Sequence, residues 1–126
     1  STPKGLFHLK KLYFRKDRVG TPKCKLSKRV INKNHAWCDD PTHKKYNEEF
    51  YTSNKNNSEI FYRKDNIYDY LITISHNENK IPNKGSAIFL HLTKNYKPTA
   101  GCIALNKKDF EILIKLINSK TRIKIG

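Results

Sequence analysis

The sequence lacks the marks of several common protein classes. None of its apolar runs approaches the length of a membrane span, and no charged-then-apolar leader of the secretory type opens it. It contains no internal repeat and no low-complexity linker, so we expect a single domain over residues 1–126. Acidic residues are few, 11 against 26 basic ones, which gives a formal net charge of +15. The excess of positive charge is therefore the most prominent feature of the composition.

The positive charge invites a nucleic-acid interpretation, but the pattern of the basic residues does not favour it. Lysine far outnumbers arginine, which is the residue best suited to base edges and phosphates. The early basic residues are interrupted by Val19, Gly20, Pro22 and Leu26 and do not follow a helix face. We therefore expect no nucleic-acid partner, although the charge would suit an acidic polymer such as cell wall.

The sequence is also poor in cysteine, and its three cysteines fit no common zinc spacing. His35, Cys38 and His43 lie close together in the sequence with Asp39, but without a C-x-x-C pair they do not favour a metal site. Cys24 and Cys38 could form a disulfide in an oxidising compartment, with the third cysteine as a free thiol. The spacing leaves that pairing open. We expect neither a metal nor a cofactor.

Periodicity predicts a mainly β domain. Alternating or β-branched runs indicate strands at residues 5–9, 68–75, 86–92 and 121–125, with Tyr13 and Phe14 as a possible continuation of the first. Residues 33–57 are rich in Asn, Asp, Lys and Ser and predict a long loop, with or without a short helix. Residues 76–85 contain Asn, Pro and Gly and predict a second loop.

One helix is expected near the C-terminus. Asn106 is a good N-cap, and Phe110, Leu113, Ile114 and Ile117 follow the i, i+3, i+4, i+7 spacing of a helix that buries one face. The sequence therefore predicts a β-rich domain with one packed helix and a long inserted loop.

One histidine and one cysteine form the strongest chemical pattern. In the strand expected at 86–92, Phe89 and His91 share one face, with aliphatic residues on the other. Cys102 follows a glycine in a turn that leads into another apolar run. A thiol is a strong nucleophile only as a thiolate, and a nearby imidazole commonly produces one. Both residues also fit a purely structural interpretation, because cysteine is often buried and His91 alternates with apolar residues.

Several segments, in a fixed order, resemble the YkuD-type L,D-transpeptidases, which remodel bacterial peptidoglycan. The family's catalytic core is similar over His91, the run Pro98-Thr99-Ala100-Gly101-Cys102-Ile103-Ala104-Leu105 and the helix that follows. A strand of the family is similar to Thr2-Pro3-Lys4-Gly5-Leu6-Phe7. A small single-domain branch is similar over Trp37–Pro41, Tyr46–Asn47, Ile67–Asp69 and Gly85–Phe89.

The resemblance spans nearly the whole chain and implies a fold. We expect an L,D-transpeptidase-like β-sandwich or barrel, mainly β, with one packed C-terminal α-helix and a long inserted loop. Family members have strands before the segment that corresponds to Thr2-Pro3, so we expect this catalytic domain to be truncated at its N-terminus.

The resemblance also implies the roles of the reacting groups. Cys102 corresponds to the nucleophile and His91 to the general base, which takes the thiol proton. A backbone carbonyl at about Leu92 would orient the imidazole. Backbone N–H groups around Gly101 and Cys102 would form the oxyanion hole.

The turn before the cysteine follows the family with one departure. Thr99 matches the Ser/Thr of the motif, whereas Ala100 stands where many members carry a second histidine. The alanine removes a second histidine that could assist the reaction, whereas the residue that corresponds to the principal base, His91, is kept. The implied reaction is acyl transfer on peptidoglycan stem peptides through a thioester, with release of the terminal D-alanine.

Substrate contacts are expected from two groups of residues, the aromatic and acidic residues of the branch-like segments and nearby cations for the carboxylates of the stem. The candidates are Trp37, Asp39, Tyr46, Arg63, Lys94 and Lys97. Structural roles compete with these assignments, because aromatic residues more often pack and aspartates often serve turns.

The same resemblance implies further properties. We expect carbapenem-type β-lactams to acylate Cys102, the protein to be a monomer, and its location to be periplasmic or cell-wall associated in a bacterium. Two alternatives remain open. The chain could be a non-enzymatic basic binding module for nucleic acid or an anionic polymer, or a relative that keeps the fold without activity.

Overall fold

The computed structural model describes residues 4–54, 56–79, 81, 86–93 and 103–125. Its elements follow in the order β1 (Gly5–Phe14), α1 (Lys16–Val19), β2 (Ser27–Val30), β3 (His35–Cys38), β4 (Glu49–Tyr51), β5 (Ser58–Ile60), β6 (Tyr70–Ile74), β7 (Phe89–Leu92), β8 (Ile103–Leu105), α2 (Lys107–Leu116) and β9 (Arg122–Ile125). The expected fold class, mainly β with a packed C-terminal helix, is confirmed. Among the described residues, no helix is both long and apolar enough to cross a membrane.

The long strand β1 organises the larger of two sheets. This six-stranded sheet has the order β2-β1-β6-β7-β8, and β9 pairs with the first half of β1. The two halves of β1 meet at a register shift between Leu9 and Leu12 in its pairing with β6. The strand expected at 5–9 and its continuation through Tyr13 and Phe14 are therefore one strand.

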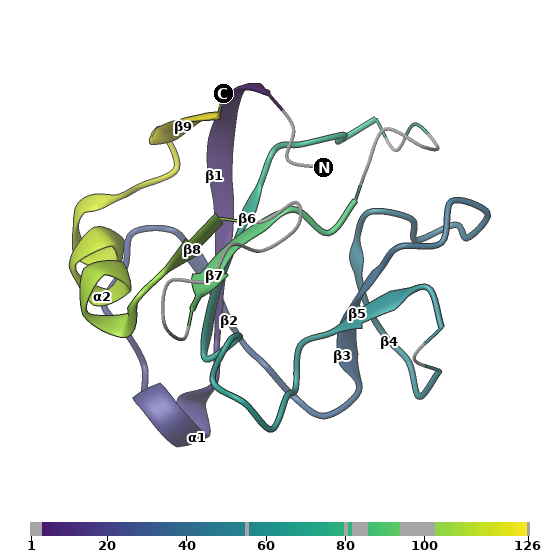
Figure 1. The fold of residues 1–126 in the computed structure, drawn as a ribbon, viewed down its shortest axis with the longest axis horizontal. Coiled ribbons are helices and arrows are strands. Elements are labelled where there is room, and N and C mark those ends of the chain that lie inside the picture. Colours follow the sequence, from purple (N-terminus) through teal and green to yellow (C-terminus); the bar gives the residue numbers. More distant parts are fainter. Residues whose placement is uncertain (1–3, 55, 80, 82–85, 94–102, 126) are drawn as a thin grey trace.

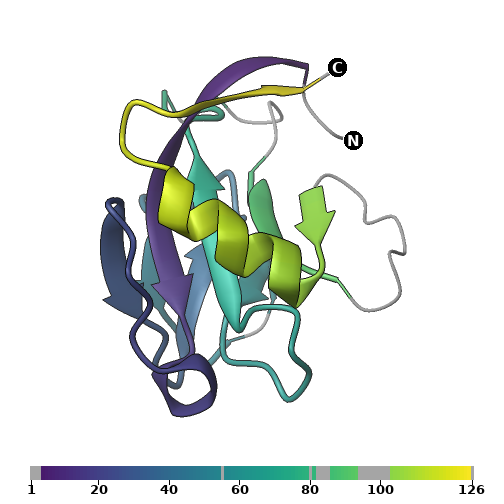
Figure 2. The ribbon, with the colours of Figure 1, turned by 90° about the vertical axis from the view of Figure 1, so that its left-hand side faces the viewer.

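The larger sheet has a hydrophobic core on each face. On one face lies α2, which crosses the sheet in Figure 2 and buries Phe110 and Ile114. On the other face the sheet packs against the three-stranded sheet β4-β3-β5, to the right in Figure 1. Successive side chains of a strand point to opposite faces, so β6 and β7 contribute to both cores.

The helix α2 begins as expected. Asn106 is its N-cap, and the side-chain Oδ1 accepts a hydrogen bond from the backbone N–H of Asp109 at 2.8 Å. This bond satisfies one of the N–H groups that a helix leaves unpaired at its start. The cap fixes where the chain turns from β8 into the helix.

The region 33–57, expected to be a long loop, instead contains β3 and β4, and β5 follows it directly. Its strands have only three or four residues, which is too short for alternation to be recognised. Asn34, Asn47 and Asn57 adopt positive φ of 66°, 59° and 55°. Asparagine tolerates this conformation, so the Asn-rich composition marks the turns between strands.

Candidate active site

His91 lies on β7, in the middle of the larger sheet. The strand pairs antiparallel with β6 and parallel with β8, and His91 is 3% exposed. Leu90 and Leu92 belong to the core beneath α2, whereas Phe89 belongs to the core beneath the smaller sheet. The predicted division of β7 into two faces is confirmed, and it directs His91 toward the side of the smaller sheet.

The backbone of β7 holds the imidazole in one orientation. His91 Nδ1 lies 2.7 Å from the carbonyl oxygen of Leu92. A carbonyl oxygen can only accept a hydrogen bond, so Nδ1 carries the proton, and Nε2 of the neutral ring keeps its lone pair. This is the carbonyl that the family resemblance implies. The ring is thus prepared to take a proton at Nε2.

The electrostatic environment keeps this ring neutral. Burial lowers the pKa of His91 below its usual value, and the nearby Arg63 cation lowers it further. The Leu92 carbonyl and the charges of Glu59 and Asp65 act in the opposite direction, and burial prevails. A neutral imidazole is the form that can act as a general base.

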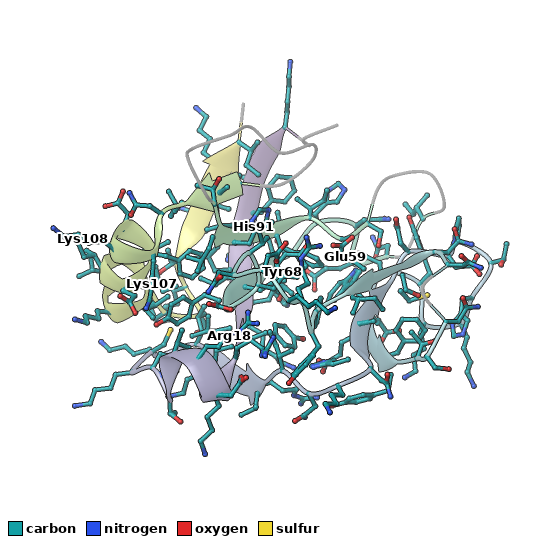
Figure 3. The ribbon with its side chains drawn as sticks, turned by 60° about the horizontal axis from the view of Figure 1, so that its bottom comes forward. Arg18, Glu59, Tyr68, His91, Lys107 and Lys108 are labelled. Atoms are coloured by element: carbon teal, nitrogen blue, oxygen red, sulfur yellow. The ribbon has the colours of Figure 1, made fainter. Side chains whose placement is uncertain are left out.

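Tyr68 forms a wall beside the imidazole (Figure 3). The two rings meet edge to face, with centroids 5.5 Å apart and planes at 80°. The Tyr68 hydroxyl donates to Glu59 Oε1 at 2.7 Å, and the Arg63 guanidinium lies 5.4 Å from the centre of the phenol ring. Arg63 is itself fixed by hydrogen bonds of 2.8 and 2.6 Å to the carboxylate of Asp65. The wall is therefore tied to β5 and to the loop that precedes β6.

A cavity of about 540 Å³ borders the end of the strand that carries His91. Its lining includes Leu92, Thr93, Arg18 and Lys107. The Arg18 guanidinium is already bound to Asp69 Oδ1 at 2.9 Å. Lys107, the first residue of α2, makes no ion pair with any residue that the structure describes. The cavity thus offers a cation near the end of the strand that carries the candidate base.

Trp37 lies on β3 of the smaller sheet, which packs against the face of the larger sheet toward which His91 is directed. Its ring meets Phe89 edge to face at 5.3 Å, and its indole N–H is shared between Asn47 Oδ1 at 3.0 Å and Ser86 Oγ at 3.2 Å. Phe89 in turn contacts Tyr68, with centroids 6.1 Å apart. Aromatic contacts therefore connect Trp37 with the wall of His91.

The comparison with protein families fits this arrangement. The family model of the YkuD domain, described as the L,D-transpeptidase catalytic domain, matches residues 1–125. The chain belongs to the YkuD family. A search of curated proteins and a search of solved structures each gave no match.

The expected nucleophile, the expected turn before it and two candidate cations fall outside the described residues. These are Cys102, Gly101, Ala100, Thr99, and the candidate cations Lys94 and Lys97. In the sequence Cys102 directly precedes Ile103, the first residue of β8. Ile103 pairs with Leu90, and Ala104 pairs with His91. The strand that follows the expected nucleophile therefore runs beside the strand of the expected base.

The structure brings some of the expected substrate residues to His91 and not others. Arg63 is connected to His91 through Tyr68, and Trp37 is connected to it through Phe89 and then Tyr68. Asp39 and Tyr46 belong to the surroundings of Trp37. Burial raises the pKa of Asp39, although its hydrogen bond with the Ser86 hydroxyl acts in the opposite direction. Burial and the Asp39 charge raise the pKa of Tyr46.

Sequence reasoning missed the partners of the wall. Glu59 lies in a polar stretch without a recognisable pattern, and nothing in the sequence links it to Tyr68. Their connection is evident only in the structure, where the Tyr68 hydroxyl donates a hydrogen bond of 2.7 Å to Glu59 Oε1.

The remaining cysteines and the metal question involve other parts of the fold. Cys24 and Cys38 are free thiols, one packed against the core beneath α2 and the other buried in β3. Within the described ranges, no group of three or more His, Cys, Asp or Glu side chains is arranged to hold a metal ion.

Proposed function

We propose that this YkuD domain is a cysteine acyltransferase that acts on peptidoglycan stem peptides through a thioester on Cys102. The observation that carries the proposal is the hydrogen bond from His91 Nδ1 to the Leu92 carbonyl. It leaves Nε2 as the proton acceptor on a strand that pairs with β8, which directly follows Cys102 in the sequence. Family membership supplies the reaction class.

The proposed reaction has two stages. In the first, His91 Nε2 takes the thiol proton, and the sulfur attacks the carbonyl between the third residue of a stem tetrapeptide and its terminal D-alanine. The C–N bond breaks, His91 returns the proton to the departing amine, and a thioester remains on Cys102. Backbone N–H groups around Gly101 and Cys102 stabilise the negative charge on the attacked oxygen.

In the second stage an amine of another stem attacks the thioester carbonyl. His91 accepts a proton from this amine and gives it to the departing thiolate, so the cysteine is regenerated and a cross-link is formed. With water in place of the amine, the same steps trim the stem. Thr99 belongs to the turn that carries the nucleophile, and Ala100 contributes no second base.

The charge of the molecule supports an anionic substrate. A stem peptide carries carboxylates, and a net charge of +15 steers anionic partners toward the protein. Lys107 at the 540 Å³ cavity and Lys97, which precedes the expected nucleophile in the sequence, are the cations proposed to meet these carboxylates. We also propose that the domain works as a monomer at the bacterial cell wall or in the periplasm, where this substrate is found.

Acylation by a carbapenem tests the nucleophile. The purified protein is incubated with the drug, and the intact mass is followed with time. The parent protein should gain the mass of one drug molecule, and Cys102→Ala should gain none. Cys24→Ala removes a different thiol, that of the partly buried Cys24, and is the matched control, so it should be labelled like the parent. Labelling that persists in Cys102→Ala contradicts the assignment.

The general base is tested with the same assay. His91→Ala should slow acylation by about 100-fold or more, as expected for loss of a general base. A parental rate in this variant would mean that another group takes the proton. Incubation with muropeptides, followed by mass analysis of the products, then identifies whether cross-linking or trimming occurs.

A non-enzymatic binding module is the competing possibility, favoured by the high positive charge. It would show tight, steeply salt-dependent binding to an anionic polymer together with an unreactive Cys102.

A further inference from the structure

A second cavity, of about 390 Å³, lies apart from His91 between the two sheets. Its walls come from β1 and β6 of the larger sheet and from β3 and β4 of the smaller one. The side chains that carry the argument are Lys10, Lys11, Trp37, Glu49, Thr73 and Glu78. A volume at the lower end of the range for ligand sites suits one or two small rings rather than a folded partner.

The floor of this cavity carries the Thr73 hydroxyl, which is free to bind a molecule in the cavity. Thr73 is 4% exposed and lies on β6, two residues after Leu71 and directly opposite Phe89 on β7. Its hydroxyl makes no hydrogen bond with any residue in the described part of the chain, and the residue lines the cavity. A molecule that bonds to this hydroxyl gains a hydrogen bond inside the cavity, where little of the residue is exposed to water.

One wall of the cavity is a rigid aromatic surface. The Trp37 indole N–H is held by Asn47 and Ser86, and the Asn47 amide donates to the carbonyls of His76 and Asn77 at 3.0 and 2.7 Å. Phe89 supports the ring from the core side. A ring that is already fixed loses little freedom when a ligand packs against it, which favours binding.

The charged groups around the cavity are paired with one another. Lys10 Nζ lies 3.1 Å from Glu78 Oε2, and Lys11 Nζ lies 3.8 Å from Glu49 Oε1. Glu49 also accepts from Arg29 at 2.6 Å. These pairs offer hydrogen-bond donors and acceptors without demanding an ion of either sign. The ligand that matches them is neutral, rich in hydroxyl groups, and apolar on the face that meets the indole.

We propose that this cavity binds a sugar ring of a neutral saccharide, with one face against Trp37 and a polar group bonded to the Thr73 hydroxyl. Identifying the saccharide as the glycan strand that carries the stem peptide rests on the proposed function. The spacing is compatible with it. Thr73 pairs with Phe89 and Leu71 pairs with His91, so Thr73 and His91 are about 7 Å apart along the strand direction.

The chain provides its own reporter for this site. Trp37 is the only tryptophan in the sequence, so the intrinsic tryptophan fluorescence reports on the cavity wall. Cys102→Ala protein is titrated with a tetramer of β-1,4-linked N-acetylglucosamine, and the emission is followed. A saturable change is expected. The absence of one, or an equal response to poly-glutamate at the same ionic strength, overturns the inference.

Matched variants in the same Cys102→Ala background locate the binding. Thr73→Val keeps the shape of the side chain and removes the hydroxyl, so the dissociation constant should rise about five-fold. Thr73→Ser keeps the hydroxyl and should bind within about two-fold of the parent. Thr21→Val changes an exposed threonine outside the cavity and should have no effect. Equal affinities of Thr73→Val and its parent overturn the assignment to this cavity.

The two proposals fail separately. Oligosaccharide binding does not require the thiol, and carbapenem acylation does not require a sugar. Loss of binding with intact acylation defeats only the saccharide site, whereas binding without acylation defeats only the acyltransfer mechanism.

Discussion

Replacement of Tyr68 separates the two contributions of this side chain to the site. Its hydroxyl donates to Glu59 at 2.7 Å, and its ring meets the His91 imidazole edge to face with centroids 5.5 Å apart. Tyr68→Phe removes the first and keeps the second. Tyr68→Leu removes both while keeping an apolar side chain in the core.

The structure sets the expected magnitudes. The Glu59 side chain is 37% exposed, so water replaces the lost hydrogen bond in part, and Tyr68→Phe should cost about 1 kcal/mol of unfolding free energy. In a domain of this length that corresponds to a fall of about 4 °C in Tm. The acylation rate should stay within about two-fold of the parent rate, because the ring still supports the imidazole. In Tyr68→Leu the imidazole loses that support, and the rate should fall about ten-fold or more.

The assay is the rate of carbapenem acylation read by intact mass, together with Tm from thermal unfolding. Tyr70→Phe is the matched control, because the Tyr70 hydroxyl also donates to a glutamate, Glu111, at 2.6 Å, but on the face covered by α2. It should lower Tm by a similar amount and leave the acylation rate unchanged. A parental acylation rate in Tyr68→Leu would refute the positioning role of the ring.

Three further predictions concern the charge of His91 and the cap of α2. Because burial lowers the pKa of folded His91 below 6.5, the unfolded state binds more protons, so Tm should fall as the pH drops through 6.5, and His91→Gln should weaken this dependence; equal slopes would contradict it. Arg63→Gln removes a nearby cation and should move the acid limb of the acylation profile to higher pH, whereas Glu59→Gln should move it to lower pH; shifts in the same direction would refute the assignment. Asn106→Ala should cost about 1 kcal/mol in chemical denaturation, since one N–H of α2 loses its acceptor, and an unchanged midpoint would exclude the cap.

The elements that the sequence predicted well are those with long or special signals. The spacing of Phe110 and Ile114 and the cap at Asn106 predicted α2, and alternation in β7 predicted that His91 faces away from the aliphatic core. The family resemblance supplied the orientation of His91 by a carbonyl at Leu92, which the 2.7 Å hydrogen bond matches. Each of these signals lies within a few residues of the chain.

The features that the sequence did not predict depend on contacts between distant segments. The strands β3, β4 and β5 have three or four residues each and become a sheet only when they pair with one another. Glu59 meets Tyr68 because β5 packs beside the loop that precedes β6. Thr73 was expected within a buried strand, but only the placement of Trp37 from β3 shows that its hydroxyl borders a cavity. No local pattern encodes such pairs.

The two faces of the larger sheet have different roles. One face forms the core beneath α2, and the other carries the candidate base. Leu90 and Leu92 join the core beneath α2, and the residue between them, His91, is directed to the other face by the alternation of the strand. Its orientation is fixed by a carbonyl of its own strand, so it does not depend on the packing of the helix. Changes beneath α2 should therefore lower the unfolding free energy without moving the pH dependence of acylation, whereas changes at Tyr68 alter both. The opposite result would mean that α2, and not the wall of Tyr68, sets the position of the imidazole.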